Sequence, residues 1–114
     1  MAFIVKISKN NDETVHIFPA KYDKYKDTYY PISYDFEDIV ELENNLLLEY
    51  QEGDIEANPI CNDDNVEIGK ANATRYKYEC LDTVDEVIDL AAALQKKHGN
   101  VCGNCVRRLY KNDD

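Results

Sequence analysis

The amino-acid sequence predicts a small α+β domain made of antiparallel hairpins, a long C-terminal helix and a zinc knuckle. Three observations favour this fold class: pairs of β-branched segments joined by turn residues, one amphipathic segment with complete capping signals, and no internal repeat or Gly/Pro-rich linker. The chain has 114 residues, a length that suits one hydrophobic core. We therefore expect residues 1–114 to form a single domain.

The first element is predicted to be a β-hairpin. Residues 3–8 and 14–18 are rich in β-branched and aromatic side chains, which favour strands. Between them, residues 9–13 contain the Asn and Asp typical of a turn. Pro19 is expected to close this unit.

The segment that follows is ambiguous. Three tyrosines at spacings of three and four favour a short helical turn before Pro31: Tyr22, Tyr25 and Tyr29. Residues 35–50 fit an amphipathic helix capped by Asp35, and they fit equally a hairpin that turns at Asn44-Asn45. Both interpretations stay open.

The second half of the chain contains a further strand and the clearest helix. Residues 74–80 alternate in polarity as a strand does, and the Val and Ile of residues 66–68 predict its hairpin partner. The helix is predicted over residues 84–98, because a capping box opens at Thr83 and a C-terminal glycine follows at Gly99.

Most of the negative charge is concentrated in one stretch. The net charge is -10, yet residues 27–69, here named the acidic segment, hold 13 Asp and Glu and no Lys or Arg. Apolar residues threaded through this segment indicate a folded surface and not a tail. An acidic surface repels nucleic acid, so we expect a cationic protein partner and no direct nucleic-acid contact. The predicted partner-binding residues are Glu41, Glu43, Glu49, Glu52, Asp54 and Glu56.

A CxxC motif near the C-terminus carries the most specific chemistry. The spacing of Cys102 and Cys105 lets two thiolates bind one tetrahedral zinc ion at about 2.3 Å. Two further ligands must come from elsewhere, and the sequence predicts Cys61 and Cys80, with His98 as the alternative to Cys61. A Zn²⁺ ion held by four protein ligands is closed to water, so its role would be structural.

The cysteines and His16 also have interpretations other than metal binding. Cys61 and Cys80 could instead be small core residues. The CxxC pair could be redox-active, although a redox CxxC opens a helix after the first strand of a βαβ unit, whereas this motif follows a helix near the chain end. His16 lies in a predicted strand without a Cys or Ser at motif spacing, and it is interpreted as a surface or packed histidine.

The sequence gives little support to an enzyme. It contains no phosphate-binding loop, serine-hydrolase motif or zinc-protease motif. No apolar run approaches the roughly 18 residues of a membrane span, and no signal-peptide core follows the start. We therefore expect a cytoplasmic protein that does not contact membranes.

In composition, the whole chain resembles phage and prophage anti-CRISPR proteins that act on type II RNA-guided nucleases. It is small, strongly acidic and rich in tyrosine, with nine Tyr, and its zinc knuckle is similar to the structural metal that a few such proteins carry. The resemblance implies a stoichiometric inhibitor in the bacterial host cytosol. Its carboxylates would occupy a channel built for phosphates and act as a DNA mimic that blocks DNA loading. The alternative is a zinc-stabilised phage protein that sequesters a nucleotide immune signal through Arg75, Arg107 or Arg108.

Overall fold

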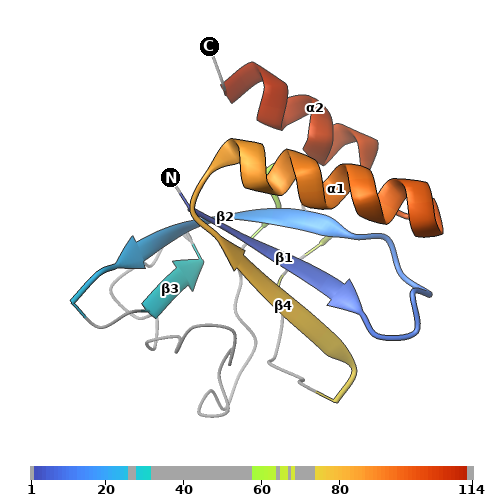
Figure 1. Ribbon diagram of the computed structural model, residues 1–114, viewed down its shortest axis with the longest axis horizontal. Coiled ribbons are helices and arrows are strands. Elements are labelled where there is room, and N and C mark those ends of the chain that lie inside the picture. Colours follow the sequence, from blue (N-terminus) through green and yellow to red (C-terminus); the bar gives the residue numbers. More distant parts are fainter. Residues whose placement is uncertain are drawn as a thin grey trace.

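The computed structural model describes residues 2–25, 28–31, 58–63, 65–66, 68 and 74–112. Within these ranges the predicted α+β class is confirmed: a four-stranded antiparallel sheet carries two helices on one face (Figure 1). The sheet order is β3-β2-β1-β4. The elements are β1 (Ala2–Ser8), β2 (His16–Asp23), β3 (Thr28–Pro31), β4 (Tyr76–Leu81), α1 (Val84–His98) and α2 (Gly103–Asn112).

The predicted N-terminal hairpin is formed by β1 and β2. Its turn is stabilised by Ser8, whose Oγ accepts the backbone N–H groups of Asp12 at 3.1 Å and Glu13 at 3.3 Å. Asn11 adopts the left-handed conformation with a φ of 55°, which asparagine tolerates better than most residues. The polar residues between the two strands therefore stabilise the turn of the hairpin.

β2 continues through Pro19, contrary to the sequence prediction. Pro19 lies opposite Phe3 of β1, and β3 pairs with β2 only from Ala20 onward. At Pro19, the edge of β2 that faces β3 therefore has no strand partner among the residues that the structure describes. The missing N–H of proline is tolerated at such a position. The predicted helical turn is also wrong, because Tyr22 and Tyr29 form a cross-strand pair between β2 and β3 with ring centroids 4.7 Å apart.

The strand predicted over residues 74–80 is present as β4, but its partner is β1. Ile4 of β1 lies opposite Cys80 of β4. Val66 and Ile68, the expected hairpin partner, lie outside any strand. β1 takes the partner's place, and all of its side chains except the half-buried Lys6 are buried, as a central position in the sheet requires.

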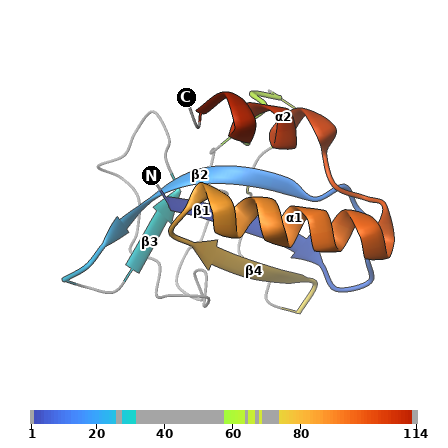
Figure 2. The same cartoon turned by 45° about the horizontal axis from the view of Figure 1, so that its top comes forward.

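β1 is the centre of the core and is buried on both faces. On one face, Phe3 and Val5 pack with Val87 of α1 and Leu109 of α2. On the other face, Ile4 belongs to a second apolar cluster that includes residues of β2, β3 and β4. Figure 2 shows the two helices lying over the first of these faces.

Helix α1 has the predicted bounds. Its N-cap is Thr83, whose Oγ accepts the N–H of Glu86 at 3.2 Å, and it ends at Gly99, which has a φ of 69° and donates its N–H to the carbonyl of Gln95. The long helix is not the last element, however. A second helix, α2, begins inside the CxxC motif at Gly103, where the sequence prediction had only a knuckle.

Several predicted features lie outside the described residues. Among them is the segment 35–50, with its helix and hairpin interpretations. The predicted partner-binding carboxylates also lie there: Glu41, Glu43, Glu49, Glu52, Asp54 and Glu56. Among the described residues, neither helix is long and apolar enough to cross a membrane.

Candidate metal centre

The first half of β2 has an outer edge that β3 does not cover, since β3 pairs only with Ala20–Asp23. The connection between the helices, residues 100–102, lies along this edge. The N–H of Val15 donates to the carbonyl of Asn100 at 2.8 Å, and the N–H of Cys102 donates to the carbonyl of Val15 at 2.9 Å. These bonds hold the start of α2 against the sheet.

A second segment, residues 58–63, reaches the same edge two residues further along. The N–H of Ile60 donates to the carbonyl of Ile17 at 2.7 Å, and the Ile60 side chain is buried in the cluster under the helices. Three parts of the chain that are distant in sequence therefore meet at the edge of β2.

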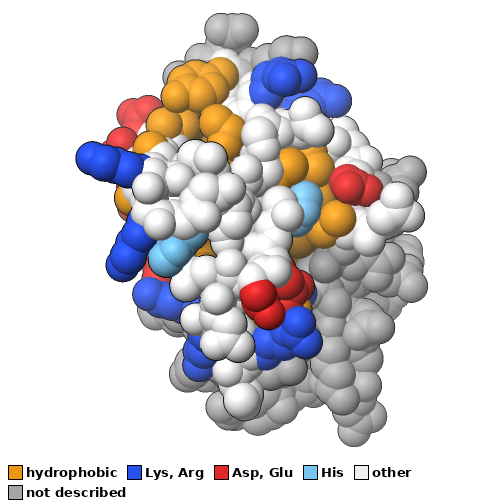
Figure 3. Space-filling view, turned by 90° about the vertical axis from the view of Figure 1, so that its right-hand side faces the viewer, with side chains coloured by type: hydrophobic (Ala, Val, Ile, Leu, Met, Phe, Trp, Pro, Cys, Tyr) orange, Lys and Arg blue, Asp and Glu red, His pale blue; other side chains and the backbone are white. Residues whose placement is uncertain are grey.

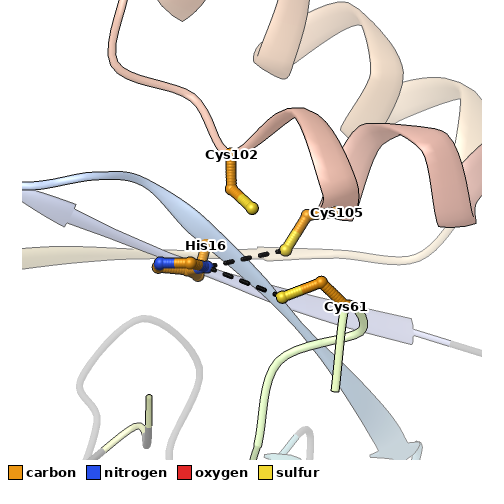
Figure 4. Close-up of side chains that lie close together, drawn as sticks. All are labelled: His16, Cys61, Cys102 and Cys105. Atoms are coloured by element: carbon orange, nitrogen blue, oxygen red, sulfur yellow. Dashed lines mark hydrogen bonds between the residues drawn. The ribbon is translucent and has the colours of Figure 1, made fainter. Parts of the chain in front are cut away.

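Four potential metal ligands lie at this meeting point: His16, Cys61, Cys102 and Cys105 (Figure 4). Their ligand atoms all lie within 4.8 Å of one another. Nδ1 of His16 is 3.7 Å from Sγ of Cys105 and 4.0 Å from Sγ of Cys61. With Zn–S and Zn–N bonds of about 2.3 and 2.0 Å, tetrahedral ligand atoms are separated by roughly 3.5–3.8 Å. The cluster therefore has the dimensions of a metal site.

The four ligands are positioned by β2, the loop 58–63 and the start of α2. Cys102 immediately precedes α2, and Cys105 lies in its first turn, so the CxxC spacing brings both sulfurs to one side of the helix start. Here the backbone N–H groups have no partner within the helix and carry its positive end, which stabilises thiolates. His16 begins β2, and Cys61 follows the residue that bonds to β2.

Burial changes the pKa values of His16 and Cys105, and both changes affect metal binding. Burial lowers the pKa of His16, with the negative charge of Asp63 opposing the shift and Lys6 adding to it. A neutral imidazole, the form that binds metals, is thereby favoured. Burial also raises the pKa of the Cys105 thiol. Metal binding must therefore displace a proton from Cys105, and metal affinity falls as the pH falls.

Two of the predicted ligands lie elsewhere. The Cys80 side chain packs with the apolar cluster on the sheet face opposite the helices, because β4 pairs with β1 in a register that turns Cys80 to that side. Burial raises the pKa of this thiol to about 12. His98 is exposed at the end of α1. The structure thus groups three of the four predicted cysteines with His16, in place of Cys80 or His98.

His16 was missed because its partners are distant along the chain. It is separated from Cys61 by 45 residues and from Cys105 by 89 residues, so no local spacing marks it as a ligand. One signal was available. The chain has only two histidines, and a site lacking one cysteine would need one of them as its fourth donor.

The ligand set gives a direct prediction. His16→Ala is expected to lower metal affinity by more than the 10–100-fold typical of losing an outer-shell partner, because it removes a ligand itself. His98→Ala is the matched control, and it should keep the metal content of the wild type. Elemental analysis of the purified variants, followed by competition with a chromophoric chelator, measures both. Wild-type metal content in His16→Ala would return the fourth position to His98 or Cys80.

Comparison with known proteins yields no relative. No family model matches the sequence, and neither the curated proteins nor the solved structures give a significant match. The role of the cluster is therefore inferred from its own geometry and chemistry.

Proposed function

We propose that His16, Cys61, Cys102 and Cys105 hold one zinc ion. The observation that carries this proposal is the convergence of four ligand atoms from three separate segments within 4.8 Å. Three thiolates and one imidazole form a borderline-soft donor set, which suits Zn²⁺ better than Mg²⁺ or Ca²⁺. The CxxC motif supplies two ligands at a spacing common in structural zinc sites.

The role proposed for this zinc is structural. Four protein ligands complete a tetrahedron and leave no position for a water molecule or substrate. The ion would instead join β2, the loop 58–63 and the start of α2, which among the described residues are also held together by backbone hydrogen bonds and by the apolar cluster under the helices. An ion in this position would stabilise the fold and would not bind a substrate.

For the activity of the protein, we propose stoichiometric inhibition through the acidic segment. In this proposal, the segment docks on a cationic nucleic-acid-handling protein, with a type II CRISPR effector nuclease as the candidate, and blocks DNA loading. The support is the charge distribution along the sequence, since residues 27–69 hold 13 Asp and Glu and no Lys or Arg. By contrast, on the one face of the molecule that Figure 3 shows, the described basic and acidic side chains are intermingled, without a continuous acidic patch.

The two alternatives have less support. A nucleotide-binding role would use free arginines, but the guanidinium of Arg75 is paired with Glu13 at 2.8 Å. Arg107 and Arg108 remain exposed on α2. A redox role would use Cys102 and Cys105 alone, whereas these thiols lie in a cluster with two more ligand residues. Burial also raises the pKa of the Cys105 thiol, whereas redox-active cysteines have a lowered thiol pKa.

The inhibition assay tests this function. Added to a guide-loaded type II nuclease before its target DNA, the protein should suppress cleavage at about one equivalent, and added after the DNA it should have little effect, because both compete for one cationic channel. Rising salt should weaken the complex. Cyclic nucleotides serve as the comparison ligands. Tight nucleotide binding without a nuclease complex would favour the alternative.

A further inference from the structure

The loop 58–63 is attached to the sheet by few contacts of its own. Among the described residues, the Ile60 N–H to Ile17 carbonyl bond is the one backbone hydrogen bond from this loop to a strand. Within the described ranges, the other backbone and asparagine hydrogen bonds of the loop stay within residues 58–66, such as Asn62 N–H to the Pro59 carbonyl at 2.9 Å and Asn58 Nδ2 to the Val66 carbonyl at 3.0 Å. In the part of the chain that the structure describes, the loop is also attached by the buried side chains of Pro59 and Ile60 and by the Cys61 thiol.

The other segment at this edge is held more firmly. Residues 100–102 form two backbone hydrogen bonds with Val15, and Nδ2 of Asn100 donates to the carbonyl of Glu13 at 3.1 Å. This segment also connects α1 and α2, which bury Val87 and Leu109 in the core. Loss of a metal ion would therefore release the loop 58–63 more readily than residues 100–102.

The loop belongs to the acidic segment, and this connects the metal to the proposed function. Cys61 is the only cysteine in residues 27–69, which contain no histidine. It is thus the one member of the metal cluster that the acidic segment supplies. Any effect of the metal on the placement of that segment at the edge of β2 passes through this residue.

We propose that Cys61 is a metal-dependent clamp that fixes the loop 58–63 of the acidic segment on the edge of β2. Bound metal joins Cys61 to His16 of the sheet and to the two cysteines of α2, and without metal the loop retains the Ile60 attachment. Metal occupancy thereby controls target binding through the attachment of this loop, in addition to any effect on the global stability of the fold. This inference rests on the proposed inhibitory function.

Amide hydrogen exchange tests the clamp without any target. In the zinc-loaded full-length protein, Cys61→Ser should accelerate exchange of the Ile60 amide by at least about tenfold, because that bond opens with the loop. In the same variant, the amides of Val5 and Val87 should exchange more slowly than the Ile60 amide, because they open with the core and not with the loop. Cys80→Ser is the matched control, since it makes the same change outside the cluster. Cys61→His, which restores a ligand, should restore protection. An unchanged Ile60 exchange rate in Cys61→Ser overturns the clamp.

Binding to a guide-loaded type II nuclease tests the coupling. Cys61→Ser should weaken binding at least about tenfold, which corresponds to about 1.4 kcal/mol, and Cys61→His should recover most of the loss. If Cys61→Ser binds as tightly as the wild type while charge reversal of the acidic segment abolishes binding, the coupling is wrong and the inhibitory function stands. If charge reversal is also without effect, the inhibitory function fails, and the exchange rate of Ile60 alone decides the clamp.

Discussion

Removal of the metal is expected to lower the melting temperature of the protein by about 10–20 °C. A ligand present at 100 to 1,000 times its dissociation constant stabilises the folded state by about 3–4 kcal/mol. In a domain of this size, each kcal/mol shifts the melting temperature by roughly 4 °C or more. The loss should be large because the cluster joins β2, the loop 58–63 and α2. Calorimetry before and after treatment with a strong chelator measures it.

Two variants make this result specific to the cluster. Cys102→Ser should melt at the lowered temperature from the start, and the chelator should not lower it further. Cys80→Ser should respond to the chelator as the wild type does, because Cys80 packs on the opposite sheet face. A purified protein that contains no metal, and whose melting temperature the chelator leaves unchanged, would contradict the zinc proposal.

Metal stabilisation should also depend on pH in a defined direction. Protons compete with the metal for the imidazole of His16 and for the three thiolates. Burial raises the pKa of Cys105, so the proton is held more tightly and competes at higher pH. The difference in melting temperature between metal-loaded and chelated protein should therefore shrink as the pH falls.

The parts of the fold that the sequence predicted correctly are those with local signals. Helix α1 could be placed because its capping residues, Thr83 and Gly99, stand next to its ends. The hairpin β1–β2 could be placed because its turn residues separate two β-branched segments. The Tyr22–Tyr29 pair was misread, since a spacing that suits a helix also arises when two strands of a hairpin place their aromatic residues opposite each other.

The ligands of the candidate metal centre likewise divide into those that a local sequence signal marks and those that depend on the fold. Cys102 and Cys105 could be recognised from their spacing, which is a local property. Whether Cys80 or His16 joins them depends on which strand pairs with which and in what register. β4 pairs with β1 so that Cys80 faces away from the helices, and the unpaired edge of β2 leaves His16 beside the sulfurs. Neither fact is encoded within a short window of sequence.

Charge reversal in the acidic segment is expected to abolish inhibition of a type II nuclease. The variant combines five substitutions to Lys, at Glu41, Glu43, Glu49, Glu52 and Asp54. An exposed ion pair contributes at most about 1 kcal/mol, so one substitution has little effect. Five together should weaken binding by at least about 100-fold, which corresponds to about 2.7 kcal/mol. Zinc content and melting temperature should stay at wild-type values, because the variant keeps all four proposed ligands, His16, Cys61, Cys102 and Cys105.

The comparison variant reverses basic residues on the described surface and leaves the acidic segment unchanged. Lys9, Lys96 and Lys97 are exposed and suit this purpose. Lys6 does not, because its Nζ donates to the carbonyl of Ile68 at 2.9 Å and lies 4.1 Å from the centre of the Tyr76 ring. Its replacement would disturb packing as well as charge. If Lys9, Lys96 and Lys97 to Glu abolishes inhibition while the acidic variant keeps wild-type potency, the contact surface is the basic one and DNA mimicry is wrong.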